Sequence, residues 1–182
     1  MRADARKNYD RLLAVGREVV TEHGAEASLR DVARRADVGL GTLYRHFPSR
    51  EALLEALLRA NVDELTADAA DRETSRSPED ALVSWLRDCV ALTHRYRGVA
   101  ALLTAAMEDA ESALYVSCVA LHDAGTRALE RAQAASIARE DIDGTDLFAL
   151  VASLAWLYDQ PSLAVRADHL FDVISGAVLT SP

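Results

Sequence analysis

The sequence predicts an all-α protein built from two helical domains, residues 1–48 and 49–182. Half of the 182 residues are apolar, and most of this excess is Ala and Leu, which form helices readily. The chain has only four prolines and eight glycines, which are few turn-forming residues for a protein built from β-sheets. Apolar residues also recur at steps of three and four, the spacing of a buried helix face.

Composition also predicts where the protein works. Cys89 and Cys118 are too few for a disulfide framework, so we expect a reducing compartment. The first twenty residues contain no uncharged apolar stretch of signal-peptide length. No window reaches the roughly 18 apolar residues that a membrane span needs. We therefore expect a cytoplasmic protein with no membrane partner.

Charge is distributed unevenly along the chain. Residues 1–50 carry 10 basic and 7 acidic side chains, whereas the remaining 132 residues carry 10 and 22. The net charges of these two parts are therefore +3 and −12, so the N-terminal part can face a polyanion that the rest repels. All basic residues but one are Arg, which suits bidentate phosphate contacts.

The N-terminal domain begins with two predicted helices. Apolar residues spaced by three and four indicate an amphipathic helix over residues 4–23, which Gly24 ends in the manner of a C-cap. A second helix of about two turns follows. Ser28 and Asp31 form a capping-box-like start for it.

The third helix begins in the sequence ADVGLGTLYRHFP. Asp37 tolerates the left-handed backbone of a tight turn, and Gly39 occupies the predicted N-cap. Leu43 and Phe47 lie four residues apart and are expected to face inward. Pro48 then ends the helix.

The C-terminal domain is predicted to be helical throughout. Ser49 caps a long helix from Arg50 to about Asp71, and Ser77 caps another with Pro78 at its first position. We expect helices near residues 78–95, 98–108, 110–135, 144–159 and 162–179, separated by Gly98, Asp143-Gly144 and Pro161.

The two glycines of GLGTLY raise two alternatives, a nucleotide-binding loop or a DNA-binding helix. A dinucleotide fingerprint requires a third glycine where Tyr44 stands, and it follows a strand rather than a helix. Two short helices joined by a tight turn instead match a helix-turn-helix, whose second helix enters the major groove. A purely structural helical hairpin remains the plain alternative.

The helix-turn-helix predicts the DNA-binding residues by their place in it. Gly41 has no side chain, so the backbone can approach the duplex, and Tyr44 and His46 have polar tips suited to phosphate oxygens. Arg50 is a cation at a helix N-terminus, which is unfavourable unless a phosphate offsets it; an idle surface Arg is the alternative. The candidates are Ser28, Arg30, Gly39, Leu40, Gly41, Thr42, Tyr44, Arg45, His46 and Arg50.

Residues 28–58, SLRDVARRADVGLGTLYRHFPSREALLEALL, closely resemble the DNA-binding region of the TetR family of bacterial repressors. The shared features are the VA..A.V turn, GTLYRHF, and the Ser-Arg-Glu-x-Leu start of the fourth helix. The resemblance extends back to about residue 5, and the rest of the chain matches only in its helical layout and length. It implies a homodimer with an N-terminal DNA-binding domain and a C-terminal effector domain.

Three positions depart from the family pattern. Asp37 replaces the usual turn glycine, and Gly39 replaces the usual Ser or Thr at the recognition-helix cap. Leu40 stands where polar residues are frequent, and an exposed leucine in a groove contacts thymine methyl groups rather than hydrogen-bonding edges. A surface leucine without a role is the alternative.

One predicted face of the C-terminal domain suits a small apolar ligand with a few polar contacts. Tyr115, Cys118 and His122 share a helix face, and side chains on neighbouring segments could close a cavity over it. The candidate ligand-binding residues are Trp85, Cys89, Met107, Tyr115, Cys118 and His122. Plain core packing is the alternative.

The last two predicted helices are apolar on most sides, which indicates burial on most sides. In a small domain this favours a four-helix interface with a second chain, with an intramolecular core as the alternative. The candidate dimer residues are Phe148, Ala152, Ala155, Trp156, Leu170, Ile174 and Val178.

No cofactor, metal or catalytic motif is predicted. Cys118 and His122 have a metal-compatible spacing but no third ligand nearby in the sequence.

The leading hypothesis is a ligand-responsive transcriptional repressor that binds palindromic double-stranded operator DNA as a homodimer and is released by an unknown small-molecule effector. The alternatives are a helix-turn-helix protein without an effector, and a helical small-molecule enzyme.

Overall fold

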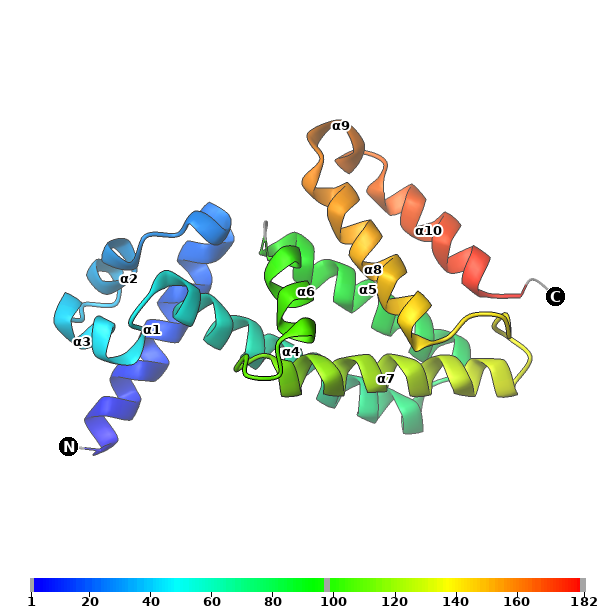
Figure 1. Cartoon of the computed structure of the whole chain (residues 1–182), viewed down its shortest axis with the longest axis horizontal. Helices are drawn as coiled ribbons and strands as arrows, with labels where there is room; N and C mark the ends of the chain where they lie inside the picture. The colour runs from blue at the N-terminus through cyan, green and yellow to red at the C-terminus, as the bar shows by residue number, and fades with distance from the viewer. Residues whose placement is uncertain (1, 97–98, 181–182) are drawn as a thin grey trace.

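The computed structural model describes residues 2–96 and 99–180, and these residues fold almost entirely into helices. Figure 1 shows α1, α2 and α3 together at one end, with α4 running from them into a body formed by the later helices. The helices are α1 (Arg2–His23), α2 (Leu29–Arg35), α3 (Leu40–His46), α4 (Arg50–Ser75), α5 (Pro78–Arg95), α6 (Ala100–Glu108), α7 (Tyr115–Ala134), α8 (Gly144–Asp159), α9 (Pro161–Ala164) and α10 (Ala167–Val178).

Several predicted helix boundaries are confirmed by their local chemistry. Gly24 follows α1 with a φ of 64°, the left-handed geometry that glycine adopts at little cost. The hydroxyls of Ser49 and Ser77 accept hydrogen bonds from backbone N–H groups in the first turns of α4 and α5. Asp143 forms a capping box with Asp146 at the start of α8.

Two helix boundaries differ from the prediction. Helix α4 continues beyond Asp71 to Ser75, where the Thr74 and Ser75 hydroxyls donate to the Asp71 carbonyl oxygen and satisfy the polar end of the helix. Helix α7 begins at Tyr115 rather than near residue 110, because the preceding residues form a turn in which the Asp109 side chain accepts the Glu111 N–H.

The predicted helix over 162–179 is two helices. The short α9 forms a corner that lets α10 return alongside α8 (Figure 1). Gly98, predicted to separate two helices, lies outside the described residues.

The N-terminal helices share a core with the first turns of α4. Leu43 of α3 and Phe47, which directly follows α3, are buried, as predicted, among apolar side chains of α1 and α2. A Cβ on Gly16 would lie 3.2 Å from a Leu53 methyl, so the small glycine allows α4 to pack closely on α1. This packing fixes the direction in which α4 leaves the N-terminal helices.

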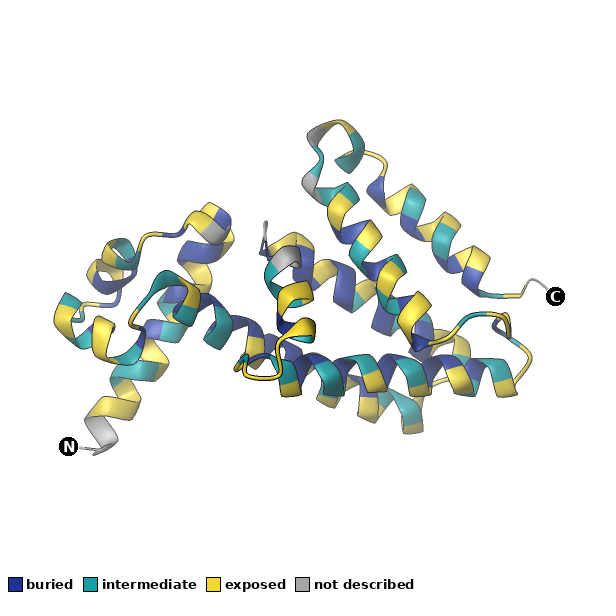
Figure 2. Cartoon of the chain, in the orientation of Figure 1, coloured by how far each residue is buried: buried dark blue, intermediate teal, exposed yellow. Residues whose placement is uncertain are grey.

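The body is a helical bundle in which α4, α5, α7 and α8 pack on one another. Its buried positions form a continuous apolar interior, and the exposed positions lie on the outer faces (Figure 2). Polar groups also tie α4 to its neighbours. Asn61 donates to the Tyr96 hydroxyl at 3.3 Å, and Ser117 donates to the Asp63 carboxylate at 2.6 Å.

Candidate functional sites

Helices α2 and α3 are joined by the predicted tight turn. Asp37 adopts a φ of 50°, which confirms the left-handed backbone expected there. The Val38 N–H donates to the Ala33 carbonyl at 3.0 Å and closes the turn, and Gly39 is the N-cap of α3. The two helices and their turn therefore form a helix-turn-helix.

The capping box predicted at the start of α2 is absent. Ser28 is the N-cap, but its side chain makes no capping hydrogen bond. The Asp31 carboxylate binds the Arg34 and Arg35 guanidinium groups instead, and these contacts lower its pKa. Ser28 is exposed, so its hydroxyl is available to a phosphate.

The outer face of α3 is formed by Gly41, Tyr44 and Arg45, which are all exposed. Tyr44 keeps 45% of its surface accessible, so its ring and hydroxyl are available to a partner. A Cβ on Gly41 would meet nothing within 4 Å. The internal packing of this chain therefore gives no reason for a glycine there, whereas close approach of a duplex does.

Three other α3 candidates lie at the edges of this face. Leu40, Thr42 and His46 are half-buried. The His46 ring lies 5.8 Å from the Tyr9 ring of α1, so part of its surface is used in packing. Leu40 also packs against the apolar core. These side chains border the outer face rather than form its centre.

The cations of the N-terminal helices fall into two groups. Arg35 forms a bidentate pair with Glu22, at 2.9 and 2.8 Å, which lowers the Glu22 pKa and ties α2 to α1. Arg50 pairs with Glu26 at 2.8 Å, so a phosphate has to compete with that carboxylate. Arg30 and Arg45 are exposed and have no hydrogen-bond or ion-pair partner among residues 2–96 and 99–180.

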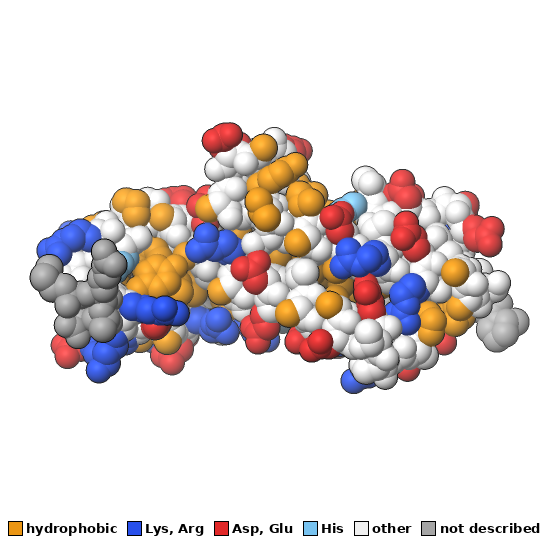
Figure 3. Space-filling view, turned by 90° about the horizontal axis from the view of Figure 1, so that it is seen from below, with side chains coloured by type: hydrophobic (Ala, Val, Ile, Leu, Met, Phe, Trp, Pro, Cys, Tyr) orange, Lys and Arg blue, Asp and Glu red, His pale blue; other side chains and the backbone are white. Residues whose placement is uncertain are grey.

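The surface charge differs between the two ends of the molecule. In the view of Figure 3, lysine and arginine side chains gather toward the end of the molecule that carries the N-terminal helices, and acidic side chains predominate toward the other end. Exposed cations next to an open helix face are suited to DNA phosphates on either side of a groove.

Removing the Arg45 cation is expected to weaken binding to all duplexes alike. The slope of log K against log salt should become shallower by about 0.9, because one phosphate contact and its released counterion are lost. Arg50→Ala should change the slope less, since Glu26 already neutralises Arg50. Titrations at several salt concentrations measure this. The control is Arg76→Ala, which removes an exposed cation between α4 and α5. If Arg45→Ala and Arg76→Ala gave the same salt slope, the phosphate contact of Arg45 would be contradicted.

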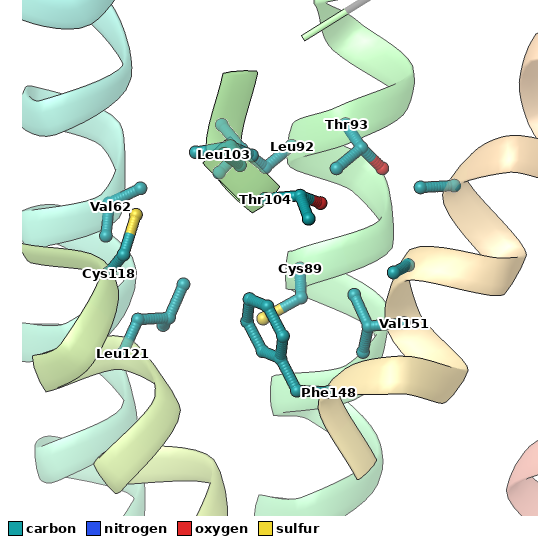
Figure 4. Close-up of a pocket in the computed structure, with 12 residues that line it drawn as sticks. Val62, Cys89, Leu92, Thr93, Leu103, Thr104, Cys118, Leu121, Phe148 and Val151 are labelled. Carbon is teal, nitrogen blue, oxygen red and sulfur yellow. The ribbon is translucent and has the colours of Figure 1, made fainter. Parts of the chain in front are cut away.

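A second site lies inside the body, in a space that we call the central cavity (Figure 4). It has a volume of about 40 Å³ and is lined by five helices. Its walls are Val62 of α4; Cys89, Leu92 and Thr93 of α5; Leu103 and Thr104 of α6; Cys118 and Leu121 of α7; and Phe148, Val151, Ala152 and Ala155 of α8.

The predicted ligand-binding residues are only partly brought together. Cys89 and Cys118 line the central cavity, whereas Trp85, Met107, Tyr115 and His122 do not. Trp85 is buried one turn away, where its ring packs on Gly125. The His122 ring lies 5.8 Å from the ring of Phe148, a cavity wall, but His122 is not itself a lining residue.

Both thiols are buried and protonated at neutral pH. Burial raises the pKa of Cys89 far above its ordinary range and that of Cys118 to about 11, with nearby carboxylates adding to both shifts. The cysteines are unpaired. No cluster of three potential metal ligands occurs in the part of the chain that the structure describes.

The candidate dimer residues are divided by the fold. Phe148, Ala152 and Ala155 line the central cavity. Val178 is buried by the chain's own helices, as is Ala155, so neither offers side-chain surface to a second chain.

The remaining candidates lie on the outside of the body. Trp156 is 58% exposed and Val173 of α10 is 53% exposed. Leu170 and Ile174 are half-buried on α10. We call these four side chains the outer apolar face.

Sequence reasoning missed most walls of the central cavity. Val62, Leu103 and Leu121 are ordinary apolar residues in helices, and no local pattern distinguishes a cavity wall from packed core. Separately, no helix among the described residues is both long and apolar enough to cross a membrane.

A helix-turn-helix with an open outer face, joined to a helical body with an internal cavity, defines a DNA-binding regulator. A family model described as bacterial regulatory proteins of the tetR family matches residues 12–57. A second, described as the C-terminal domain of SbtR-like transcriptional regulators, matches residues 77–176. The chain therefore belongs to the TetR family of transcriptional regulators, and the enzyme alternative is excluded.

Individual proteins support the same assignment. The TetR regulator SCO0520 of Streptomyces coelicolor has 33% identity and a TM-score of 0.70, with 96% of this chain and 99% of that one covered. A TetR regulator of Mycobacterium vanbaalenii has 28% identity and a TM-score of 0.67, with 98% and 99% covered.

Among curated relatives, the regulator UidR of Escherichia coli K12 is 29% identical over 110 residues, which are 60% of this chain and 55% of UidR. The alignment thus spans about half of that relative.

Proposed function

We propose that this protein is a transcriptional repressor that binds a near-palindromic operator as a homodimer and is released by a small molecule in the central cavity. Residues 1–48 form the DNA-binding domain, and residues 49–182 bind the effector and the second chain. A repressor of chromosomal genes works in the cytoplasm. The DNA contacts are made by the outer face of α3, with Ser28, Arg30 and Arg50 on the flanking phosphates.

One observation carries the proposal: a single helix, α4, lines the cavity and also packs on α1 of the DNA-binding domain. Val62 of α4 forms part of the cavity wall, and Leu53, two and a half turns earlier, packs against α1 at Gly16. A ligand that displaces Val62 therefore acts on the same rigid element that sets the direction of the DNA-binding domain. In a dimer, a tilt of α4 in each chain changes the spacing of the two α3 helices.

The neighbours of Val62 hold α4 in place. Asn61 is bonded to Tyr96 at the end of α5, and Asp63 accepts from Ser117, which precedes the cavity residue Cys118. These contacts join α4 to the end of α5 and to α7 on both sides of Val62. A ligand that pushes Val62 outward acts against them, which links ligand binding to the position of α4.

The outer apolar face supports the dimer, because Trp156 and Val173 are exposed and Leu170 and Ile174 are only half-buried. Trp156→Glu should weaken dimerisation at least about 30-fold, since a central interface tryptophan contributes about 2 kcal/mol or more. Analytical ultracentrifugation measures this. Val116→Glu is the control, because Val116 is 75% exposed on α7, away from this face. Equal weakening by both variants, or by neither, would contradict this interface.

The proposed function is tested by a thermal-shift screen of small molecules followed by operator titration. An effector should raise the melting temperature and weaken DNA binding, and operator DNA must weaken effector binding by the same factor. A hundredfold effect corresponds to about 2.7 kcal/mol of coupling. Compounds that bind the central cavity without altering operator affinity would favour the helix-turn-helix protein without an effector.

A further inference from the structure

The central cavity has walls without charge. None of its lining residues is Asp, Glu, Lys, Arg or His. The Thr93 hydroxyl already donates to the Val90 carbonyl at 2.8 Å, so its proton is committed within α5. Because the raised pKa values keep both thiols protonated, neither supplies a negative charge or a ready nucleophile at neutral pH.

The cavity opens between α6 and α8. Thr104 is exposed on α6, whereas Phe148 and Ala152 of α8 are half-buried. Helix α6 has 9 residues, the fewest of the five wall helices. We therefore expect this rim to yield before the rest of the wall.

The size of the cavity limits its ligands. Its volume of about 40 Å³ is well below the roughly 150 Å³ of an apolar cavity that takes benzene. Even a single ring requires some widening at the rim. An ionised group on such a ligand would lose its hydration among apolar walls with no counter-charge to replace it.

We propose that the central cavity selects small uncharged apolar molecules of about one ring, and rejects carboxylates and ammonium ions of the same shape. This inference rests on the proposed function, because it names the chemical class of the effector. The cavity discriminates against ions because none of its lining residues is charged, and not because a specific hydrogen bond recognises the ligand.

Three probes of nearly equal shape test the selectivity: toluene, benzoate and benzylammonium. Calorimetry on the full chain at neutral pH should show toluene binding and the two ions binding at least about 100-fold more weakly. Benzoate or benzylammonium binding as tightly as toluene would overturn the proposal. So would the absence of measurable binding by saturated toluene.

A positive charge added at the rim should strengthen the binding of an anion. A variant that is merely misfolded would not show such a gain in affinity. Thr104→Lys places an ammonium at the cavity mouth and should strengthen benzoate binding about tenfold or more. The matched control is Ala105→Lys, because Ala105 is the next residue of α6, is exposed and does not line the cavity. Thr104→Val tests the loss of the hydroxyl alone and should leave toluene binding within about twofold. Equal gains in Thr104→Lys and Ala105→Lys would overturn the proposal.

A second measurement separates this inference from the proposed function. The three probes are added to the complex of the protein with its operator, and release is followed by fluorescence anisotropy. Toluene that binds selectively without releasing DNA would contradict the ligand response and leave the selectivity of the cavity intact. Release by benzoate but not by toluene would overturn the selectivity and support a ligand response.

Discussion

Gly41→Glu is expected to weaken operator binding at least about 100-fold, because a carboxylate on the outer face of α3 would meet the phosphates and base edges of the major groove. The fold should be unaffected, since a Cβ at this position has nothing within 4 Å in the free protein. Anisotropy titrations measure the affinity, and thermal melting checks the fold. Unchanged operator affinity would contradict the placement of α3 against DNA.

Gly41→Ala tests whether the backbone approaches DNA closely, because it adds a methyl group without adding a charge. The free energy of unfolding and the operator affinity should then change in opposite directions. Alanine favours a helix interior over glycine by up to about 1 kcal/mol, so the free energy of unfolding should rise. Operator affinity should nevertheless fall, because the added methyl group occupies space that the duplex requires. A more stable variant with full affinity would show that the backbone at Gly41 does not approach DNA.

Gly125→Ala is expected to destabilise the body by about 3 kcal/mol, at the upper end of overpacking costs. A Cβ on Gly125 would lie 2.4 Å from Cζ2 of Trp85, a separation that real Cβ contacts essentially never show. The indole is rigid and buried, so relief requires α5 and α7 to separate. Denaturant unfolding measures the loss, and Gly176→Ala on α10 is the control because nothing lies within 4 Å of its Cβ.

A double-mutant cycle identifies the Trp85 ring as the cause. Trp85→Leu removes the ring that the new methyl group strikes, so the double variant should lose clearly less stability than the two single losses combined. Strict additivity would contradict the close packing of α5 on α7.

The DNA-binding half could be predicted because its signals are local. Gly24, Asp37 and Ser49 each act within their own turn, and Pro48 has no N–H with which to continue the helix before it. One local prediction failed because other residues competed: the Asp31 carboxylate binds Arg34 and Arg35, and the start of α2 has no capping box. A distant residue also bears on Arg50, because Glu26 pairs with its guanidinium group, and the phosphate contact of Arg50 stays a prediction.

The second site could not be predicted because it exists only after the helices pack. Cys118, Leu121 and His122 lie within about one turn of α7, and their spacing alone does not show which of them faces a space. Ala152 and Ala155 belong to a helix that is apolar on most sides. The sequence pattern shows that such a helix is buried, but not whether its own chain, a cavity or a second chain covers each side.

The proposed DNA-binding mode is tested most directly by selecting duplexes from a random pool with the full chain, footprinting the tightest-binding duplex and measuring the mass of its complex by native mass spectrometry. We expect an inverted repeat bound by two chains, with half-sites centred roughly 34–36 Å apart or somewhat more. A minimal site without two-fold symmetry, bound by a single chain, would contradict it.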